Sequence, residues 1–267
     1  MKSLLKKIVP RFVLSWYHLG WAFFGALIYG FPARKMTVVG VTGTDGKSTT
    51  TEMISRIFTE AGYKTCSTSS VWFQVGDKKE KNHLKMGMPG RMFLQKFLRD
   101  AQKEGCTHAI IEVSSEGILQ NRHKFLNFHT AVITNLSPEH IERHGSFEKY
   151  RAEKQKLFHL AKQVHVVNGD DEHAKHFLQF SAQETYVYGL QKAPSLPDIT
   201  KYITAEHITE HKGGTSFRIH ETEFQLNLVG QFNAYNALAA VCVALAHGIS
   251  MDVCKQALAN MPTMPGR

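Results

Sequence analysis

A glycine-rich segment that directly follows a short apolar run carries residues suited to phosphate chemistry. Residues 36–42, MTVVGVT, are apolar and β-branched, and they predict a buried strand. Residues 43–50 then read GTDGKSTT, and a helical pattern continues to about residue 62. Glycines let backbone N–H groups converge on phosphate oxygens, and a helix N-terminus adds partial positive charge. The segment therefore predicts a phosphate-binding loop for a nucleotide.

The side chains of this loop have distinct expected roles. Lys47 would neutralise the β- and γ-phosphates of the nucleotide, and Ser48 would bind Mg²⁺. The usual pattern has a glycine five residues before Gly46, where this sequence has Val41. A glycine-rich turn without a ligand is the alternative, but GKST after a strand has few other uses. The expected nucleotide-binding residues of the loop are Gly43, Thr44, Asp45, Gly46, Lys47, Ser48 and Thr49.

Alternating strand and helix patterns surround the loop and must position it. This alternation predicts an α/β fold, a mostly parallel sheet flanked by helices, with the ligand at the carboxyl ends of the strands. The expected order is helix 3–28, strand 36–42, helix 47–62, short strands near 64–75, helix 90–104, strand 107–113, strand 129–134, helix 146–161, strand 163–168, helix 171–180 and strand 184–188. Residues 168–171, NGDD, are interpreted as a turn with a helix cap.

The pattern changes after residue 200. Residues 201–210, 214–220 and 222–229 predict a small antiparallel sheet, with Gly213-Gly214 as a hairpin turn. Helices over 231–247 and 250–260 then close the domain.

Composition and charge narrow the class of protein. The chain has 267 residues with 43% hydrophobic content, enough for one large domain or two modest ones. Its four cysteines are scattered without a CxxC motif, which argues against a disulfide framework or a structural zinc module. The net charge is +9, but six Lys and Arg residues lie before the first acidic residue, Asp45. Because no basic, aromatic face follows, nucleic acid is not an expected partner.

The first 35 residues are expected to form a separate hydrophobic and basic helix. Residues 12–31 carry no Asp, Glu, Lys or Arg. A membrane span would leave Lys2, Lys6, Lys7 and Arg11 in the cytoplasm and export the rest of the chain away from ATP. We therefore favour a helix that lies in the inner membrane surface of an otherwise cytoplasmic protein. A hydrophobic helix packed on the main domain is the alternative.

Four ordered motifs give the chain a resemblance to the Mur ligase family, and to its MurE-like subtype in particular. The loop TGTDGKST resembles the form found in that family. Residues 110–115, IIEVSS, resemble its EVSS motif, and 134–140, TNLSPEH, with 144–150, HGSFEKY, and Lys154 resemble its TNL, DH and HG block. Residues 230–240, GQFNAYNALAA, and 265–267, PGR, resemble its later motifs. The resemblance covers about residues 36–267, as the central ATP-binding domain.

The resemblance implies an ATP-dependent ligase of bacterial peptidoglycan precursor synthesis. Such an enzyme phosphorylates a muramoyl-peptide carboxylate to an acyl phosphate, which the amine of an amino acid then attacks. Ser48 and Glu112 would share one Mg²⁺, and the resemblance implies a second Mg²⁺ near His140 and a carbamylated Lys154. A bare lysine ammonium would repel Mg²⁺, whereas a carbamate supplies an oxygen ligand. The implied catalytic residues are Lys47, His140 and Lys154.

Further site residues follow from the same resemblance. Asn233 and Asn236 would contact adenine, Asn236 most directly, and Arg267 would approach the ATP phosphates. As an alternative, the two asparagines cap the helix that starts near residue 231. Ser114, Gln120 and Arg122 would bind the carboxylate substrate, with Arg122 able to bind an anion bidentately.

The sequence departs from the MurE-like pattern around the substrate. Glu116 and Glu139 stand where those enzymes usually have His and Asp, and residues 85–90, KMGMPG, replace a threonine-rich loop. MurE-type enzymes also carry an N-terminal domain of about a hundred residues that grips UDP, which is the size of a small domain. We therefore expect either a UDP-linked or a lipid-linked acceptor, with residues 1–34 placing the domain at the membrane in the second case.

Other readings stay open at this point. The family continues into a third, amino-acid-binding domain, so the C-terminal domain is expected to be absent here. Either the sequence is part of a longer chain, or a separate partner chain supplies that domain. A non-catalytic Mg-ATP-binding subunit that scaffolds a partner enzyme at the membrane is an alternative of a different class. Folylpolyglutamate and cyanophycin-type ligases share the ATPase motifs and form another.

Overall fold

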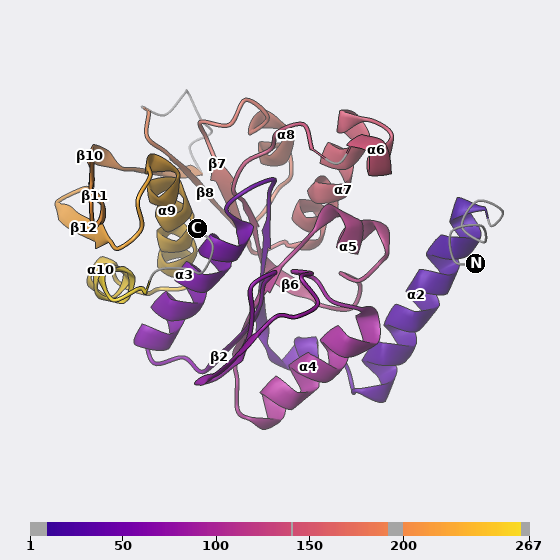
Figure 1. Cartoon of the computed structure of the whole chain (residues 1–267). Coiled ribbons are helices and arrows are strands. Elements are labelled where there is room, and N and C mark those ends of the chain that lie inside the picture. Colours follow the sequence, from indigo (N-terminus) through magenta and orange to yellow (C-terminus); the bar gives the residue numbers. More distant parts are fainter. Residues whose placement is uncertain (1–9, 140, 192–199, 263–267) are drawn as a thin grey trace.

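The computed structural model describes residues 10–139, 141–191 and 200–262. Its centre is a nine-stranded sheet in the order β4-β3-β2-β5-β1-β6-β7-β8-β9, with helices on both faces (Figure 1). All neighbours from β2 to β9 pair in parallel, whereas β3 and β4 form an antiparallel edge. The strands are β1 Thr37–Thr42, β2 Thr65–Thr68, β3 Trp72–Val75, β4 Lys78–Lys81, β5 His108–Glu112, β6 Phe128–Ile133, β7 Val164–Asn168, β8 Glu184–Gly189 and β9 Thr200–Thr204.

Two hydrophobic cores sandwich this sheet, because side chains of the central strands alternate between its faces. Val39 and Val41 of β1 face one core, and Val38 faces the other. The first core contains α3 (Lys47–Glu60), α9 (Gln231–Ala246) and α10 (Met251–Ala259). Residues of α4 (Arg91–Lys103), α5 (Ser115–Leu119), α7 (Phe147–Leu160) and α8 (Lys175–Leu178) belong to the second core. A short helix α6, Ile141–His144, precedes α7. The predicted α/β fold class is confirmed.

A small antiparallel sheet lies beside α9, as the sequence predicts. Its strands are β10 (Glu206–His211), β11 (Gly214–Ile219) and β12 (Thr222–Leu226). Phe217 and Phe224 pair across β11 and β12, and their rings stack with centroids 5.3 Å apart.

Two predicted elements are wrong in detail, and a strand was missed. The strand expected over 201–210 is two strands, β9 in the large sheet and β10 in the small one, which separate at Ala205. The start of β10 is itself irregular, with a register shift between Glu206 and Thr209 and φ +53° at His207. The charged strand β4 was not predicted, since KKEK lacks the apolar alternation of a half-buried strand. The helix expected over 171–180 shrinks to α8, because Asp171 accepts backbone N–H bonds from Leu136 and His173 instead.

The apolar N-terminal segment forms helix α2, Arg11–Ile28, followed by a 3₁₀ helix η1, Pro32–Lys35. The first part of the helix predicted over 3–28 lies outside the described residues. Ala22 and Ala26 are fully buried, and Gly25 lies against Met92 of α4. Among the helices of the described residues, none is long and apolar enough to cross a membrane. One face of α2 is thus packed on the domain.

Three histidines meet at the amino-terminal edge of the sheet and set a pH dependence. His247, after α9, lies with its ring centroid 5.0 Å from that of His129 and 6.2 Å from that of His108. Burial, together with the smaller effect of the nearby His129 and His108, lowers the pKa of His247 to about 4. The unfolded chain titrates near the ordinary value of about 6.5, so protons bind preferentially to the unfolded state as the pH falls.

We therefore expect acidification to destabilise the protein through His247. This one group should lower the free energy of unfolding by about 2 kcal/mol between about pH 7.5 and about pH 5. Urea unfolding at both pH values measures this loss of stability. In the variant His247→Gln, the decrease in the free energy of unfolding between the two pH values should be smaller by that amount. An equal loss in both proteins would contradict the assignment.

Candidate active site

The glycine loop connects the carboxyl end of β1 to the N-terminus of α3. Gly43 adopts φ +149° and Gly46, which precedes the first helical residue, adopts φ +78°. A side chain at Gly43 would collide with the hydroxyl of Thr134, and one at Gly46 would collide with the amide oxygen of Asn236. Both positions therefore require glycine, and the predicted strand, loop and helix arrangement is present.

Residues that follow β6 hold the loop in shape. The Thr134 hydroxyl donates to the Asp45 carbonyl at 2.6 Å, and the Asp45 N–H donates to the Asn135 side chain at 2.9 Å. The Ser137 N–H donates to the Thr44 hydroxyl at 2.9 Å. Because the loop is fixed by these bonds, its backbone donors need little rearrangement before they meet an anion.

Ser48 and Glu112 form the oxygen-rich centre of the site. The Ser48 hydroxyl donates to Glu112 Oε2 at 2.6 Å, and the backbone N–H of Ser70 donates to the same oxygen at 2.9 Å. Glu112 is the last residue of β5 and is only 4% exposed. Hydroxyl and carboxylate oxygens are ligands that suit Mg²⁺.

This pair fits the type of site that Mg²⁺ uses with nucleotides. The described part of the chain contains no group of three or more His, Cys, Asp or Glu residues placed to hold a metal ion. Mg²⁺ commonly binds one or two protein ligands and completes its octahedron with waters and substrate phosphates. Ser48 and Glu112 match that chemistry, while Lys47 donates to the Thr44 carbonyl at 2.6 Å on the other side of the loop.

Lys154 is a buried amine beside the same loop. Its side chain belongs to α7, is 1% exposed, and donates from Nζ to the Gly43 carbonyl at 2.7 Å. The amine also lies 4.5 Å from the ring centroid of Tyr150. Burial holds the pKa of Lys154 well below its usual range, and the charge of Lys47 lowers it further. The spacing of the sequence alone favours a solvated helix lysine here, whereas the structure buries the amine against the loop. The role that the resemblance implies for Lys154 stays a prediction.

A cavity of about 500 Å³ opens next to the loop. It is lined by Asp45, Gly46, Thr134, Asn135, Asn168, Phe232, Tyr235 and Asn236. Phe232 is 62% exposed and offers an aromatic face for a nucleobase.

The two asparagines at the start of α9 have different positions. Asn236 lines the cavity, whereas the lining does not include Asn233. Asn233 instead donates to the Val229 carbonyl at 2.9 Å and accepts from Asn236 at 3.3 Å. Asn233 therefore orients Asn236, and its predicted direct contact with adenine stays a prediction.

The NGDD segment after β7 belongs to the site, which the sequence interpretation missed. Asn168 lines the cavity and donates to the Thr134 carbonyl at 2.8 Å. Asp170 accepts from the Tyr235 hydroxyl at 2.8 Å and thus fixes a second cavity side chain. The sequence did contain a signal for this placement, because the segment lies at the carboxyl end of a predicted parallel strand, where ligands bind in such sheets.

The predicted substrate residues lie together on the segment after β5. Arg122 donates to the Gln120 side chain at 2.8 Å and to the Met88 carbonyl at 2.5 Å. The Ser114 hydroxyl accepts the Gly117 N–H at 3.1 Å and caps α5. Burial lowers the pKa of Arg122, as expected for a guanidinium partly withdrawn from water.

Arg91 joins this group, although the sequence analysis did not select it. It is the first residue of α4 and donates from Nε to the Gln120 carbonyl at 3.0 Å. Burial lowers the pKa of Arg91, and the nearby charge of Arg122 lowers it further. Two partly buried guanidinium groups that both donate to Gln120 favour an anion near them. An arginine directly after Pro89-Gly90 at a predicted helix start was the only signal.

The nucleotide loop and the substrate segment adjoin each other at Glu112. A side chain at Gly87 would collide with the Glu112 carboxylate, so the 85–90 loop passes directly over it. The same loop receives the Arg122 bond through Met88. His140 and Arg267 lie outside the described residues, so their predicted roles stay predictions.

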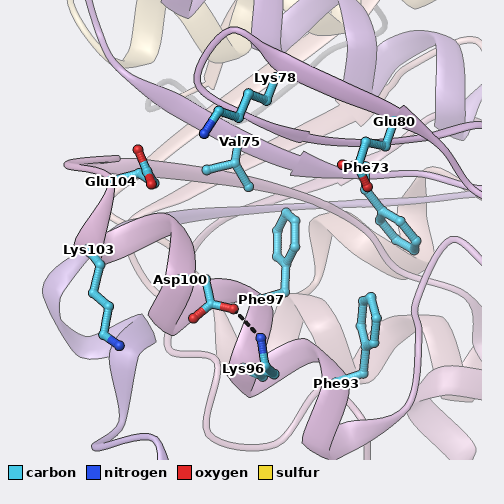
Figure 2. Close-up of a pocket in the computed structure, with 10 residues that line it drawn as sticks. All are labelled: Phe73, Val75, Lys78, Glu80, Phe93, Lys96, Phe97, Asp100, Lys103 and Glu104. Carbon is cyan, nitrogen blue, oxygen red and sulfur yellow. Dashed lines mark hydrogen bonds and ion pairs between the residues drawn. The ribbon is translucent and has the colours of Figure 1, made fainter.

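A second cavity, of about 410 Å³, lies between the β3–β4 hairpin and α4 (Figure 2). Phe73, Phe93 and Phe97 form its apolar wall, and Lys96 pairs with Asp100 at its rim. It contains none of the residues that carry the predicted chemistry, so the glycine loop remains the candidate active site.

Comparison with known proteins decides the family. The Mur ligase middle domain model matches residues 41–244. The chain belongs to the Mur ligase family. Among curated Mur ligases, the UDP-N-acetylmuramyl-tripeptide synthetase of Roseiflexus sp. (strain RS-1) is 34% identical over 262 residues, 91% of this chain and 50% of that protein. The UDP-N-acetylmuramoyl-L-alanyl-D-glutamate–2,6-diaminopimelate ligase of Clostridium botulinum is 33% identical over 243 residues, 90% of this chain and 48% of that protein.

Solved Mur ligase structures share the fold. A UDP-N-acetylmuramoyl-L-alanyl-D-glutamate–2,6-diaminopimelate ligase superimposes with a TM-score of 0.75 at 25% sequence identity. The superposition covers 87% of this chain and 47% of the ligase chain. MurF from Acinetobacter baumannii gives a TM-score of 0.71 at 21% identity, covering 94% and 51%, which shows the fold alone. The chain thus spans about half the length of the relatives it matches.

Proposed function

We propose that this chain is the ATP-binding core of a ligase that joins a muramoyl-peptide carboxylate to the amine of an amino acid. The carboxylate attacks the γ-phosphorus of ATP, ADP leaves, and the resulting acyl phosphate is displaced by the amine with release of phosphate. Both steps gather negative charge, so catalysis depends on positioning and charge neutralisation. Membership of the Mur ligase family and relatives named as muramoyl-peptide ligases support this proposal.

One observation carries the proposal. The glycine loop, the Ser48–Glu112 pair and the Arg122 segment converge on one sheet edge, with Gly87 against Glu112. A site for nucleotide phosphates therefore adjoins a site for an anionic acceptor, as transfer between them requires. An ATP-binding scaffold without catalysis does not need the second site.

Different residues of the chain would have different roles in this reaction. Ser48 and Glu112 would hold one Mg²⁺, and His140 with a carbamylated Lys154 would hold a second. When bound, Mg²⁺ neutralises phosphate charge and orients the γ-phosphate. Lys47 would hold the β- and γ-phosphates, and Asn236 with Phe232 would hold the base.

Carbamylation suits the surroundings of Lys154. The amine is enclosed beside Gly43 and Tyr150, where an uncompensated ammonium is costly. A neutral amine is the form that reacts with carbon dioxide, and the product is an anionic oxygen ligand. The buried position thus favours the modified residue once Mg²⁺ is present.

The acceptor's carboxylate is expected to bind between Arg122 and Arg91. We predict that Arg122→Ala weakens binding of a muramoyl peptide by about 10- to 100-fold, because a charge-assisted bidentate contact is lost. Mg-ATP affinity should stay within about twofold. Calorimetric titration of the chain with UDP-linked muramoyl peptide and, separately, with Mg-ATP measures both.

A different pattern would exclude the ligase assignment. If the chain binds Mg-ATP but neither wild type nor Arg122→Ala binds any muramoyl peptide, the scaffold alternative is favoured. Binding of a folate or an arginine-rich peptide at the same site would instead favour the folylpolyglutamate or cyanophycin-type alternative. We further propose that the protein works in the cytoplasm, where ATP is present, and touches the inner membrane surface through its N-terminal helix.

A further inference from the structure

Helix α2 packs one face on the domain and exposes the other, and the exposed face is apolar. No charged residue lies between Phe12 and Phe31. Trp16 and Phe24 are 72% and 55% exposed. The exposed large apolar side chains of this helix recur three or four residues apart, which places most of them on one stripe. They are Val13, Trp16, Tyr17, Trp21, Phe23, Phe24, Leu27 and Ile28.

This stripe differs from ordinary surface hydrophobicity. Single exposed apolar residues are common on soluble domains, whereas contiguous aromatic and aliphatic patches mark interaction sites. The helix lies at the edge of the molecule, with α4 and α5 on its inner side (Figure 1). Its aromatic residues are of the kind that sit at the boundary between lipid and water.

The charge of the same segment is suited to an anionic partner. Every charged residue before Asp45 is basic, and these are Lys2, Lys6, Lys7, Arg11, Arg34 and Lys35. Arg34 and Lys35 belong to η1, just beyond the C-terminal end of α2. An apolar helix face flanked at both ends by basic residues matches the surface of a bilayer that contains anionic lipid.

The inner face of α2 touches the substrate segment. The Asn121 side chain donates to both the carbonyl and the hydroxyl of Ser15, at 3.1 Å each. His18 contacts the guanidinium of Arg91, which itself donates to the Gln120 carbonyl. The helix is therefore joined by hydrogen bonds to the residues that receive the acceptor's anionic group.

The substrate segment and the loop that it contacts also expose apolar side chains. Leu119 is exposed and precedes Gln120, and Met86 is exposed, with its sulfur 3.7 Å from the Arg122 guanidinium. Apolar side chains are therefore exposed beside the proposed acceptor site as well as on α2.

We propose that α2 docks the domain on an anionic membrane surface and thereby presents the Gln120–Arg122 segment to a lipid-linked muramoyl peptide. The helix lies in the plane of the interface with its aromatic stripe among the lipids. The hydrogen bonds through Ser15 and His18 then hold the acceptor segment at headgroup level, where a lipid-linked sugar-peptide resides. The second part rests on the proposed function, whereas the docking itself does not.

Vesicle co-sedimentation of the full chain tests the docking. Vesicles of phosphatidylglycerol and phosphatidylcholine should bind the chain at least about 10-fold more tightly than pure phosphatidylcholine vesicles, and salt should weaken the binding. The variant Trp16→Glu/Phe24→Glu should lose at least about 10-fold of that affinity, because two charges enter the apolar stripe. Leu160→Glu, at an exposed apolar position on α7, is the matched control and should bind like wild type.

Two results would overturn the docking proposal. The first is equal binding of the wild type to anionic and to neutral vesicles. The second is equal vesicle binding by Trp16→Glu/Phe24→Glu and Leu160→Glu, provided that both variants keep the Mg-ATP affinity and the circular dichroism spectrum of the wild type. If the wild type does not bind Mg-ATP at all, the proposed function is contradicted, whereas the result of the vesicle experiment remains valid.

A second arm tests the acceptor. Vesicles that also carry a lipid-linked muramoyl peptide should bind the wild type at least about fivefold more tightly than the same vesicles without it. Arg122→Ala should lose this increment and keep its affinity for plain vesicles. If the lipid-linked peptide adds nothing while the soluble UDP-linked peptide binds, the acceptor is UDP-linked and the second part is overturned.

Discussion

Replacing Lys47 with alanine is expected to weaken Mg-ATP binding by at least about 100-fold, because the loop loses its main charge-assisted contact with the phosphates. In the structure the Lys47 amine donates to the Thr44 carbonyl, inside the loop itself. A triphosphate would replace that weak partner with two anionic groups. Isothermal calorimetry with Mg-ATP measures the change.

A matched substitution separates this effect from a general loss of positive charge. Lys96 is exposed on α4 and pairs with Asp100, at the rim of the second cavity. Lys96→Ala removes the same charge and should leave Mg-ATP affinity within about twofold, since exposed charges at a distance are screened. Equal affinities for the Lys47 and Lys96 variants would remove the glycine loop as the nucleotide site.

Replacing Lys154 with methionine is expected to stabilise the free domain and to abolish carbamate formation. Methionine fills a similar volume without a desolvated ammonium, so the free energy of unfolding should rise by about 2 kcal/mol near neutral pH. The sign follows from the pKa, which burial lowers in the folded state, so the unfolded chain binds the proton more tightly. Most buried lysines without a ligand role would give the same gain in stability, so stability alone does not show function.

Two measurements complete the test of Lys154. In buffer free of carbon dioxide, the difference in the free energy of unfolding between wild type and Lys154→Met should shrink as the pH rises toward about 10.4. Around that pH, Lys154 loses its proton in the unfolded chain as well as in the folded one. With ¹³C-labelled bicarbonate, Mg²⁺ and ATP, the wild type should show a carbamate NMR signal and the variant none. A wild-type protein without that signal would refute carbamylation, and a variant less stable than wild type would refute the buried-charge argument.

The fold and the phosphate loop were predictable because their signals are local. An apolar β-branched run followed by GTDGKSTT specifies a strand, a tight turn and a helix start within a few residues. The parallel pairing of β1, β5, β6 and β7 follows from the alternation of strands and helices. Ser48 and Glu112 therefore come together at the carboxyl ends of the strands, as expected.

Features that depend on contacts between distant segments were not predictable. Arg91 shows no motif of its own, and its role arises because Gln120 and Arg122 fold against the start of α4. The docking of α2 through Ser15 likewise depends on a loop more than one hundred positions away. The chain passes from the large sheet to the small one between Thr204 and Glu206, although the strand pattern of the sequence is continuous there.

The base contact proposed for Asn236 would connect recognition of the base to the shape of the phosphate loop. Its amide oxygen accepts from Thr50 at 3.3 Å and fills the space above Gly46, while the same side chain lines the adjoining cavity. A nucleotide whose base pushes this amide aside would also move Gly46. In the proposed enzyme, selectivity among nucleobases and accurate placement of the triphosphate would therefore be coupled, and a mismatched base would lower turnover as well as affinity.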